Sequence, residues 1–235
     1  MAIHNPRFDM HRFSEALSYA TILHAKQTRK GSDLPYVSHL LSVASLAMEY
    51  GANEDETIAA LLHDAAEDQG GKPTLNVIRR KFGAVVAEIV DGCTDAYAEA
   101  GAKKPQWKKR KVQYIAHLYA ASKSVRLVSA ADKLHNARAI LADYREHKEK
   151  VFKRFKKSKD ETLWYYRRLA STYKELLPGQ LADELQRTVT TLEKSATSKN
   201  DLHAKNKKMS VYRNLDAAFD RELAKRTVAT VHRRK

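Results

Sequence analysis

Apolar residues recur at helical spacing along most of the chain. In the segment 53–68 they fall at positions i, i+3, i+4 and i+7, which places side chains on one face of an α-helix. These positions are Ile58, Leu61, Leu62 and Ala65. The same spacing predicts further helices over 8–27, 38–50, 74–82, 84–97, 106–121, 124–146 and 159–176. No convincing run of alternating apolar and polar residues predicts a strand, so the pattern predicts an all-α protein.

Two of the predicted helices carry a capping signal at the N-terminus. Asn53 is followed three residues later by Glu56, and Ser158 is followed three residues later by Glu161. This is the spacing of a capping box, in which each side chain accepts from the backbone N–H of the other residue. The second of these helices should stop at Pro178–Gly179, because proline cannot continue a helix and glycine favours its end.

The chain changes character after residue 177. Residues 178–235 contain one amphipathic stretch over 180–194, a polar linker, and a last amphipathic stretch near 210–226 that is followed by HRRK. We therefore expect one helical-bundle domain over 1–177 and a basic helical extension over 178–235. The extension could pack on the domain, mediate oligomerisation or extend into solvent, and its composition does not choose among these.

Cysteine content and hydropathy point to a cytoplasmic protein. Cys93 is the single cysteine, so no intrachain disulfide can form. The N-terminal residues MAIHNPRFDMHRFSEA carry scattered charges and no apolar core, unlike a secretory signal. No stretch of 18 consecutive apolar residues occurs, so we expect no membrane crossing.

Net charge favours anionic partners, and the alternative is a solvated basic surface that keeps the protein soluble by self-repulsion. The 235 residues include 43 Lys and Arg against 28 Asp and Glu, a formal charge of +15 at pH 7. Such a field attracts polyphosphates and nucleic acid alike. Residues 148–159 (KEKVFKRFKKSK) form a candidate anion patch, with seven basic residues and one acid. Residues 103–111 (KKPQWKKRK) are better explained as a solvated loop and helix start than as a phosphate contact.

The sequence HDAAED over 63–68 concentrates polar chemistry at the end of an apolar helix. In a continuous helix His63 and Glu67 lie one turn apart, as do Asp64 and Asp68. An imidazole and an adjacent carboxylate can share one divalent ion, and the later carboxylates can then reach a water molecule. The alternative is a set of surface residues beside the following glycine pair. It is less favourable because acids at a helix C-terminus oppose the helix dipole.

Two other predicted helices supply further candidate ligands. His39 lies at the start of an apolar helix, where a lone histidine is more often a satisfied core or cap residue. Asp132 follows an apolar stretch, and burying an acid there is costly unless it is paired or bound to a metal. An ion pair of Asp132 with Lys133 or Arg138 is the alternative. With the HD pair these residues give two imidazoles and two carboxylates, a set that suits Mn²⁺, Fe²⁺ or Zn²⁺.

Three segments of the chain resemble the hydrolase domain of the RelA/SpoT stringent-response enzymes, in particular the small alarmone hydrolases. They are RKGSDLPYVSHLLSVA (29–44), AALLHDAAEDQGG (59–71) and VSAADKLHNARAI (128–140). The resemblance covers about residues 8–177. It implies an HD-domain helical bundle that uses Mn²⁺ to remove the 3′-pyrophosphate from (p)ppGpp, giving GDP or GTP plus pyrophosphate.

The resemblance also implies a role for each matching position. The implied Mn²⁺ ligands are His39, His63, Asp64 and Asp132, the implied catalytic pair is Glu67 and Asp68, and the implied nucleotide contacts are Arg29, Lys30, Asn136 and Tyr165. Within LWYYRRLA, Trp164 or Tyr166 could occupy the tyrosine's place instead. The extension after residue 177 is too short for a synthetase domain, so we expect hydrolysis without synthesis. Its basic character is not part of the family's core pattern.

Two other functions stay open at this stage. The same site could act on another 3′-phosphorylated nucleotide, such as pApp, ppApp or NADPH, because nothing in the metal cluster selects the base. The chain could instead be a nucleic-acid-binding module on an HD scaffold. The complete HDxxED cluster makes nucleic acid the less favoured partner and a small nucleotide the expected one. The sequence does not show the oligomeric state.

Overall fold

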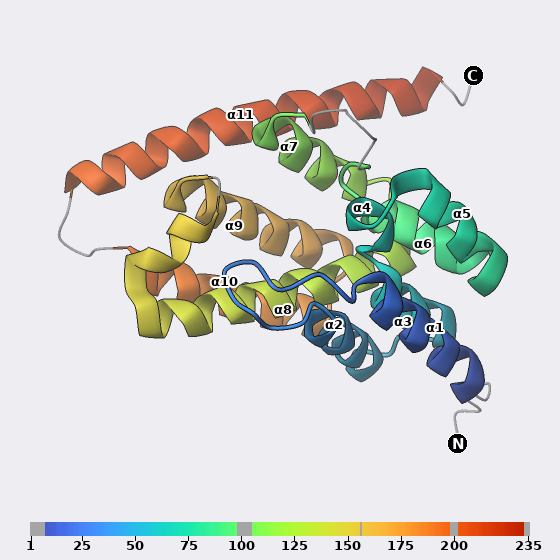
Figure 1. The fold of residues 1–235 in the computed structure, drawn as a ribbon. Coiled ribbons are helices and arrows are strands. Elements are labelled where there is room, and N and C mark those ends of the chain that lie inside the picture. The colour runs from blue at the N-terminus through green and yellow to red at the C-terminus, as the bar shows by residue number, and fades with distance from the viewer. Residues whose placement is uncertain (1–7, 98–104, 156, 198–201, 233–235) are drawn as a thin grey trace, which may run out of the picture. The chain divides into compact units, whose positions relative to one another are not determined.

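The computed structural model describes residues 8–97, 105–155, 157–197 and 202–232, and these residues are almost entirely helical (Figure 1). The helices are, in order, α1 (Met10–Leu23), α2 (Val37–Glu49), α3 (Glu54–Leu62), α4 (Ala65–Asp68), α5 (Gly71–Phe82), α6 (Ala84–Cys93), α7 (Trp107–Leu118), α8 (Lys123–His147), the 3₁₀ helix η1 (Lys148–Arg154), α9 (Lys159–Leu176), α10 (Gln180–Ala196) and α11 (Leu202–His232). Among these residues, extended pairing is limited to one isolated bridge between Thr28 and Pro35. The all-α prediction is confirmed.

The chain divides into two compact units. The first unit comprises residues 1–104 and 122–135, and the second comprises 105–121 and 136–235. The helix α8 contributes its first half to one unit and its second half to the other. The boundary predicted after residue 177 falls inside the second unit and stays a prediction.

The first unit is built around the buried helix α3. Helices α1, α2 and α6 pack on α3, and α5 packs on α6. Arg12 fastens α1 in place: its guanidinium pairs with Glu54 at 2.5 Å and Asp55 at 2.7 Å, and donates to the Phe82 carbonyl at 2.6 Å. The largest fully buried apolar side chains here are Leu40, Ile58, Leu61, Leu62, Ile78 and Leu134. This core fixes the C-terminal end of α3, where the HD pair lies.

Both predicted capping boxes are present. The Asn53 side chain accepts from the Glu56 backbone N–H at 3.0 Å, and Glu56 accepts from the Asn53 N–H at 2.8 Å. The same reciprocal pair joins Ser158 and Glu161 at the start of α9. These caps satisfy backbone donors that a helix start otherwise leaves unpaired.

The predicted continuous helix over 53–68 is wrong at its most important point. Helix α3 ends at Leu62, and α4 begins only at Ala65. Asp64 adopts φ −95° and ψ −3°, close to the sparsely populated bridge region. In a continuous helix, adjacent side chains point about 100° apart. The break instead brings His63 Nε2 to 3.0 Å from Asp64 Oδ2.

The C-terminal extension packs within the second unit. Helices α10 and α11 both pack on α9, and α11 also packs on α7. Tyr212, Leu215 and Phe219 of α11 are at most 3% exposed, and Trp164 Nε1 donates to Asp216 at 2.9 Å. Helix α11 spans Leu202–His232, so it is longer than the stretch predicted near 210–226 and the linker is correspondingly shorter. Part of that linker, and the last residues of HRRK, lie outside the described residues.

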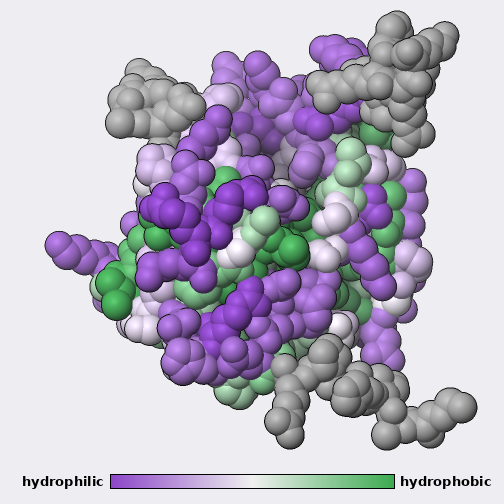
Figure 2. Space-filling view, turned by 90° about the vertical axis from the view of Figure 1, so that its right-hand side faces the viewer, coloured by the Kyte–Doolittle hydropathy of each residue, from purple (hydrophilic) through white to green (hydrophobic). Residues whose placement is uncertain are grey.

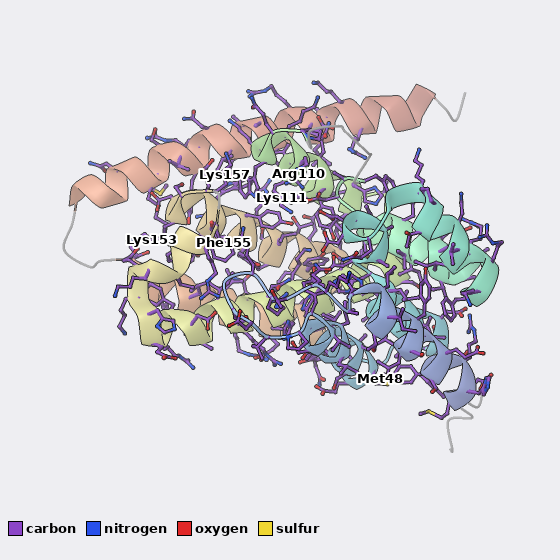
Figure 3. All side chains as sticks on the ribbon, in the orientation of Figure 1. Met48, Arg110, Lys111, Lys153, Phe155 and Lys157 are labelled. Atoms are coloured by element: carbon purple, nitrogen blue, oxygen red, sulfur yellow. The ribbon has the colours of Figure 1, made fainter. Side chains whose placement is uncertain are left out.

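The basic segment 148–159 begins as the 3₁₀ helix η1, where Val151 and Phe152 are buried and the charged side chains point outward. Lys153 and Phe155 mark this turn in Figure 3.

No helix among the described residues is long and apolar enough to span a bilayer. Hydrophilic residues cover most of the face shown in Figure 2.

Candidate metal centre

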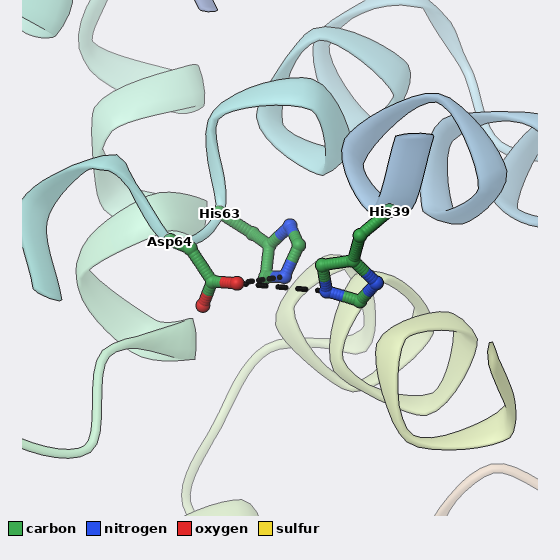
Figure 4. A group of neighbouring side chains, drawn as sticks. All are labelled: His39, His63 and Asp64. Atoms are coloured by element: carbon green, nitrogen blue, oxygen red, sulfur yellow. Dashed lines mark ion pairs between the residues drawn. The ribbon is translucent and has the colours of Figure 1, made fainter. Parts of the chain in front are cut away.

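The four predicted metal ligands lie together inside the first unit. His63 Nε2 lies 3.0 Å from Asp64 Oδ2 and 3.7 Å from Asp132 Oδ1. His39 Nε2 lies 3.5 Å and 3.2 Å from the same two oxygens. The ligand atoms of His39, His63 and Asp64 all fall within 4.8 Å of one another (Figure 4). Three segments distant in sequence, α2, the α3–α4 junction and α8, therefore converge on one point.

The two imidazole rings are held in a way that leaves one nitrogen of each for this point. His63 Nδ1 lies 2.8 Å from the Ala60 carbonyl oxygen, and His39 Nδ1 lies 2.7 Å from Nδ1 of His135. Both Nε2 atoms are buried and have no hydrogen-bond partner of suitable geometry. A buried nitrogen without a partner is costly, and metal-binding histidines typically engage the second ring nitrogen in this manner. The geometry therefore suits a cation.

The spacing of the donor atoms also suits a single ion. Ligand atoms about 2.1 Å from a common metal lie about 3.0 to 3.4 Å apart in octahedral or tetrahedral arrangements. The observed nitrogen–oxygen distances run from 3.0 to 3.7 Å. The set of two imidazoles and two carboxylates can therefore hold one divalent metal, with positions left for water and substrate.

Electrostatics in the cluster follow from burial and close opposite charges. Burial disfavours the charged form of His63, but the Asp64 and Asp132 carboxylates outweigh it and raise the pKa of His63 well above its usual range. Burial would likewise raise the pKa of Asp64, but the nearby His63 and His39 lower it well below its usual range. The pKa of Asp132 is lowered in the same way, with Lys133 as the largest opposing cause. The carboxylates are thus ionised and ready to bind a cation.

Asp132 uses its two oxygens differently. Its Oδ2 pairs with Lys133, while its Oδ1 faces the two histidines. The ion pair of Asp132 with Lys133 and the contacts of Asp132 with the two histidines therefore occur together. Arg138 instead pairs with Glu184 at 3.4 Å, within the second unit.

Two further side chains belong to this centre, and the sequence analysis missed both. The Tyr36 hydroxyl donates to Asp64 Oδ2 at 2.5 Å, and burial followed by the Asp64 charge raises the pKa of Tyr36. His135 Nδ1 lies against His39, and burial, followed by the neighbouring His39 and Arg29, lowers the pKa of His135 to about 4. Both lie in segments already singled out, but hydrophobic periodicity gives no signal for such contacts.

The predicted catalytic pair lies on the short helix α4, directly after the HD pair. Glu67 Oε2 accepts from the Asp95 backbone N–H at 3.2 Å. Asp68 Oδ2 accepts from Gln27 Nε2 at 2.9 Å. Both carboxylates are therefore oriented by the chain, and neither lies among the four converging side chains.

The predicted basic pair lies on the segment between α1 and α2. The Arg29 guanidinium lies 5.7 Å from the centre of the Tyr36 ring, whose hydroxyl in turn bonds Asp64. The Arg29 backbone N–H donates to the Leu34 carbonyl at 2.8 Å, which folds this segment back on itself. Lys30, next in the chain, is exposed.

Asn136 and Tyr165 belong to the second unit, and their part in the site stays a prediction. Asn136 follows His135 directly on α8. Tyr165 is buried on α9, where its ring contacts Trp107 edge-on and lies 5.0 Å from the Lys111 ammonium. Trp164, the alternative to Tyr165, is fully buried and bonds Asp216 within the second unit.

Sequence comparisons connect this chain with hydrolases of the HD type. A profile of the HD domain family matches residues 16–171. A guanosine-3′,5′-bis(diphosphate) 3′-pyrophosphohydrolase MESH1 of Danio rerio is 34% identical over 129 residues, which cover 54% of this chain and 67% of that protein. A probable GTP pyrophosphokinase of Mycobacterium leprae is 32% identical over 145 residues, which cover 60% of this chain. The chain spans less than a fifth of the GTP pyrophosphokinases that it matches.

Solved structures share the fold. A metazoan orthologue of SpoT, described as hydrolysing ppGpp, superposes with a TM-score of 0.60 at 23% identity, over 79% of this chain and 97% of that one. A structure from Listeria monocytogenes superposes with a TM-score of 0.56 at 27% identity, over 66% of this chain and 99% of that one. This chain therefore contains nearly all of each neighbour's fold.

Proposed function

Because this chain belongs to the HD domain family, in the group that includes the MESH1 pyrophosphohydrolases, we propose that it removes the 3′-pyrophosphate from (p)ppGpp, giving GDP or GTP plus pyrophosphate. The observation that carries the proposal is the convergence of two buried imidazole nitrogens on two carboxylates, with nitrogen–oxygen distances of 3.0 to 3.7 Å. The relatives' names supply the substrate class.

The proposed metal ligands are His39, His63, Asp64 and Asp132. We propose Mn²⁺ as the ion, because the mixed nitrogen and oxygen set suits it and the resemblance to the alarmone hydrolases implies it. When bound, the ion would supply Lewis acidity at the phosphoryl oxygen and at a nucleophilic water. The hydrogen bonds of Tyr36 and His135 hold Asp64 and His39 in the required orientation.

Glu67 and Asp68 are proposed to orient the attacking water and to accept its proton. They lie three and four residues after Asp64, on helix α4, and each carboxylate accepts a hydrogen bond that fixes its direction. A carboxylate that accepts a proton during attack on phosphorus typically contributes about 10²- to 10⁴-fold to the rate. The pyrophosphate then leaves from the 3′-oxygen, which takes up a proton.

The nucleotide is proposed to bind beside Arg29 and Lys30. Arginine can pair bidentately with phosphate or stack on a base, whereas lysine acts as a point charge. The Arg29 guanidinium lies 5.7 Å from the centre of the Tyr36 ring, and the Tyr36 hydroxyl bonds Asp64, which suits contact of Arg29 with a phosphate beside the cluster. Asn136 and Tyr165 complete the proposed nucleotide contacts. A cytoplasmic location is part of the proposal, in keeping with the single buried thiol of Cys93.

The test is release of pyrophosphate from ppGpp by the full chain, with Mn²⁺ added or chelated. We expect turnover only with the ion, and no turnover in Asp64→Ala, because that variant loses a proposed ligand. In Glu67→Gln/Asp68→Asn we expect turnover to fall at least about 100-fold while Mn²⁺ still binds, because only proton acceptance is removed.

Glu88→Gln is the matched control, since it removes one exposed acid on α6, away from the cluster. It should retain full turnover. Circular dichroism should show equal helix content in every variant. Full turnover in Asp64→Ala, or turnover of the wild type that persists in excess chelator, would refute the proposal.

A further inference from the structure

The whole excess of positive charge belongs to the second unit. Residues 105–121 and 136–235 contain 29 Lys and Arg against 13 Asp and Glu, a formal charge of +16. The first unit contains 14 against 15, a formal charge of −1. The proposed metal ligands and the acidic pair lie in the nearly neutral unit, so they do not account for the positive charge of the second unit.

Most acidic side chains of the second unit form ion pairs with a subset of its basic residues. Arg154 pairs with Asp143, Lys159 with Glu149, Arg168 with Asp216 and Asp220, Lys174 with Asp183, Lys208 with Glu193, and Arg226 with Glu222. Many basic side chains remain without an acidic partner within 4 Å in the described part of the chain. They include Lys108, Lys109, Lys148, Lys150 and Lys153, which we call the lysine set.

The lysine set lies on the surface of α7 and η1. All five side chains are exposed, and Figure 3 labels Lys153 and Lys157 of the basic segment and Arg110 and Lys111 of α7. Helix α7 has no acid in its first turn. Cations at a helix N-terminus oppose the helix dipole and destabilise it slightly. The helix dipole therefore gives no reason for Lys108 and Lys109 to stand at the start of α7.

The surroundings of these lysines distinguish among anionic partners. Of the large hydrophobic side chains that are exposed, Met209 alone belongs to the described residues of the second unit. A membrane-binding helix inserts apolar side chains beside its basic ones, and a protein interface has an apolar or aromatic centre. Among the residues whose side chains the structure describes, the second unit offers neither. Its described aromatic rings are all buried or half-buried, which also disfavours the base stacking used for single strands.

We infer that the second unit binds double-stranded nucleic acid through the phosphate backbone, by the lysine set and the neighbouring basic residues of α7 and η1. Backbone contacts of this kind need positive charge and no apolar surface. The inference goes beyond the proposed hydrolysis and is independent of it. It assigns to the second unit a partner that the sequence analysis had ranked below a small nucleotide.

The test is fluorescence anisotropy with a labelled 20-bp duplex, made as RNA and as DNA, at rising NaCl concentration. The full chain should bind with an affinity that falls linearly on a log–log plot as salt rises. The variant Lys108→Gln/Lys109→Gln/Lys150→Gln/Lys153→Gln should bind the duplex at least about 10-fold more weakly at 0.1 M salt. Its plot of log affinity against log salt concentration should also be shallower, because each lost phosphate contact reduces the magnitude of that slope by about 0.9. A preference between RNA and DNA would identify the natural source of the duplex.

A matched control removes the same charge from the first unit: Lys72→Gln/Arg80→Gln/Lys81→Gln/Lys123→Gln changes four exposed side chains there. It should bind the duplex within twofold of the wild type, and both variants should melt at the wild-type temperature. Absence of duplex binding at 50 mM salt, or an equal loss in the control, would overturn the inference. So would tighter binding to a single strand or to phosphatidylserine vesicles than to either duplex.

Discussion

Each histidine of the candidate metal centre uses its two ring nitrogens differently. His63 Nδ1 lies against a backbone carbonyl, which can only accept a hydrogen bond, so in the neutral ring the proton is on Nδ1 and the Nε2 lone pair faces the cluster. For His39, the atom beside Nδ1 is Nδ1 of His135, 96 residues away, at 2.7 Å. The orientation of both Nε2 atoms thus depends on contacts made by the opposite side of each ring, outside the cluster.

His135→Ala should therefore weaken Mn²⁺ binding by about 10- to 100-fold, because loss of a residue that orients a metal ligand typically has this effect. Isothermal titration calorimetry measures it. His147→Ala, at the exposed end of the same helix α8, is the control and should bind Mn²⁺ as the wild type does. Unchanged affinity in His135→Ala would show that His39 needs no such support.

At the scale of residues, the sequence motifs were sufficient to identify the four side chains that converge. Their role as metal ligands remains a prediction. Tyr36 and His135 could not be found in the same way. Their partners, Asp64 and His39, are 28 and 96 residues distant, and no periodicity in the sequence specifies a contact across such separations. The alternative prediction, an ion pair of Asp132 with Lys133, is correct for one of the two Asp132 carboxylate oxygens.

At the scale of elements, the helix break between α3 and α4 is the feature that makes the site. Hydrophobic spacing predicted one helix over 53–68, because the apolar stripe continues through Ala65 and Ala66. The break turns the His63 and Asp64 side chains toward each other. The periodic pattern of apolar residues contains no information about that orientation. Helix starts marked by capping boxes were predictable, since the signal is local. The early start of α11 was not, because its first turns are polar.

Close helix packing in the first unit offers a test of the fold. Gly92 of α6 faces α8, and a Cβ there would lie 2.5 Å from Val125 Cγ2. Gly92→Ala should therefore destabilise the protein by about 1–3 kcal/mol, as overpacking typically does, although alanine favours a helix more than glycine. Urea unfolding monitored by circular dichroism measures the change.

The companion variant is Gly92→Ala/Val125→Ala, which removes the methyl groups that the new Cβ would meet. It should be more stable than the sum of the two single changes predicts, because the clash is relieved. Strict additivity of the two free-energy changes would mean that α6 and α8 do not approach as closely as the structure has them.

At the scale of the whole molecule, the two units differ in net charge and in the candidate functional residues that they contain. The four converging side chains and the acidic pair belong to the first unit, while the second unit holds the basic excess and the packed C-terminal helix. The total of +15 was evident from the sequence, but its separation was not, because the second unit is assembled from two stretches of chain that composition alone does not join.

The central claim is that His39, His63, Asp64 and Asp132 hold one divalent ion. Anomalous diffraction at the manganese edge, from crystals soaked in MnCl₂, tests it most directly. We predict one strong peak per chain, bounded by these four side chains at about 2.0 to 2.2 Å from each, and no such peak in Asp64→Ala crystals. A peak elsewhere, or none at a saturating concentration, would contradict the account.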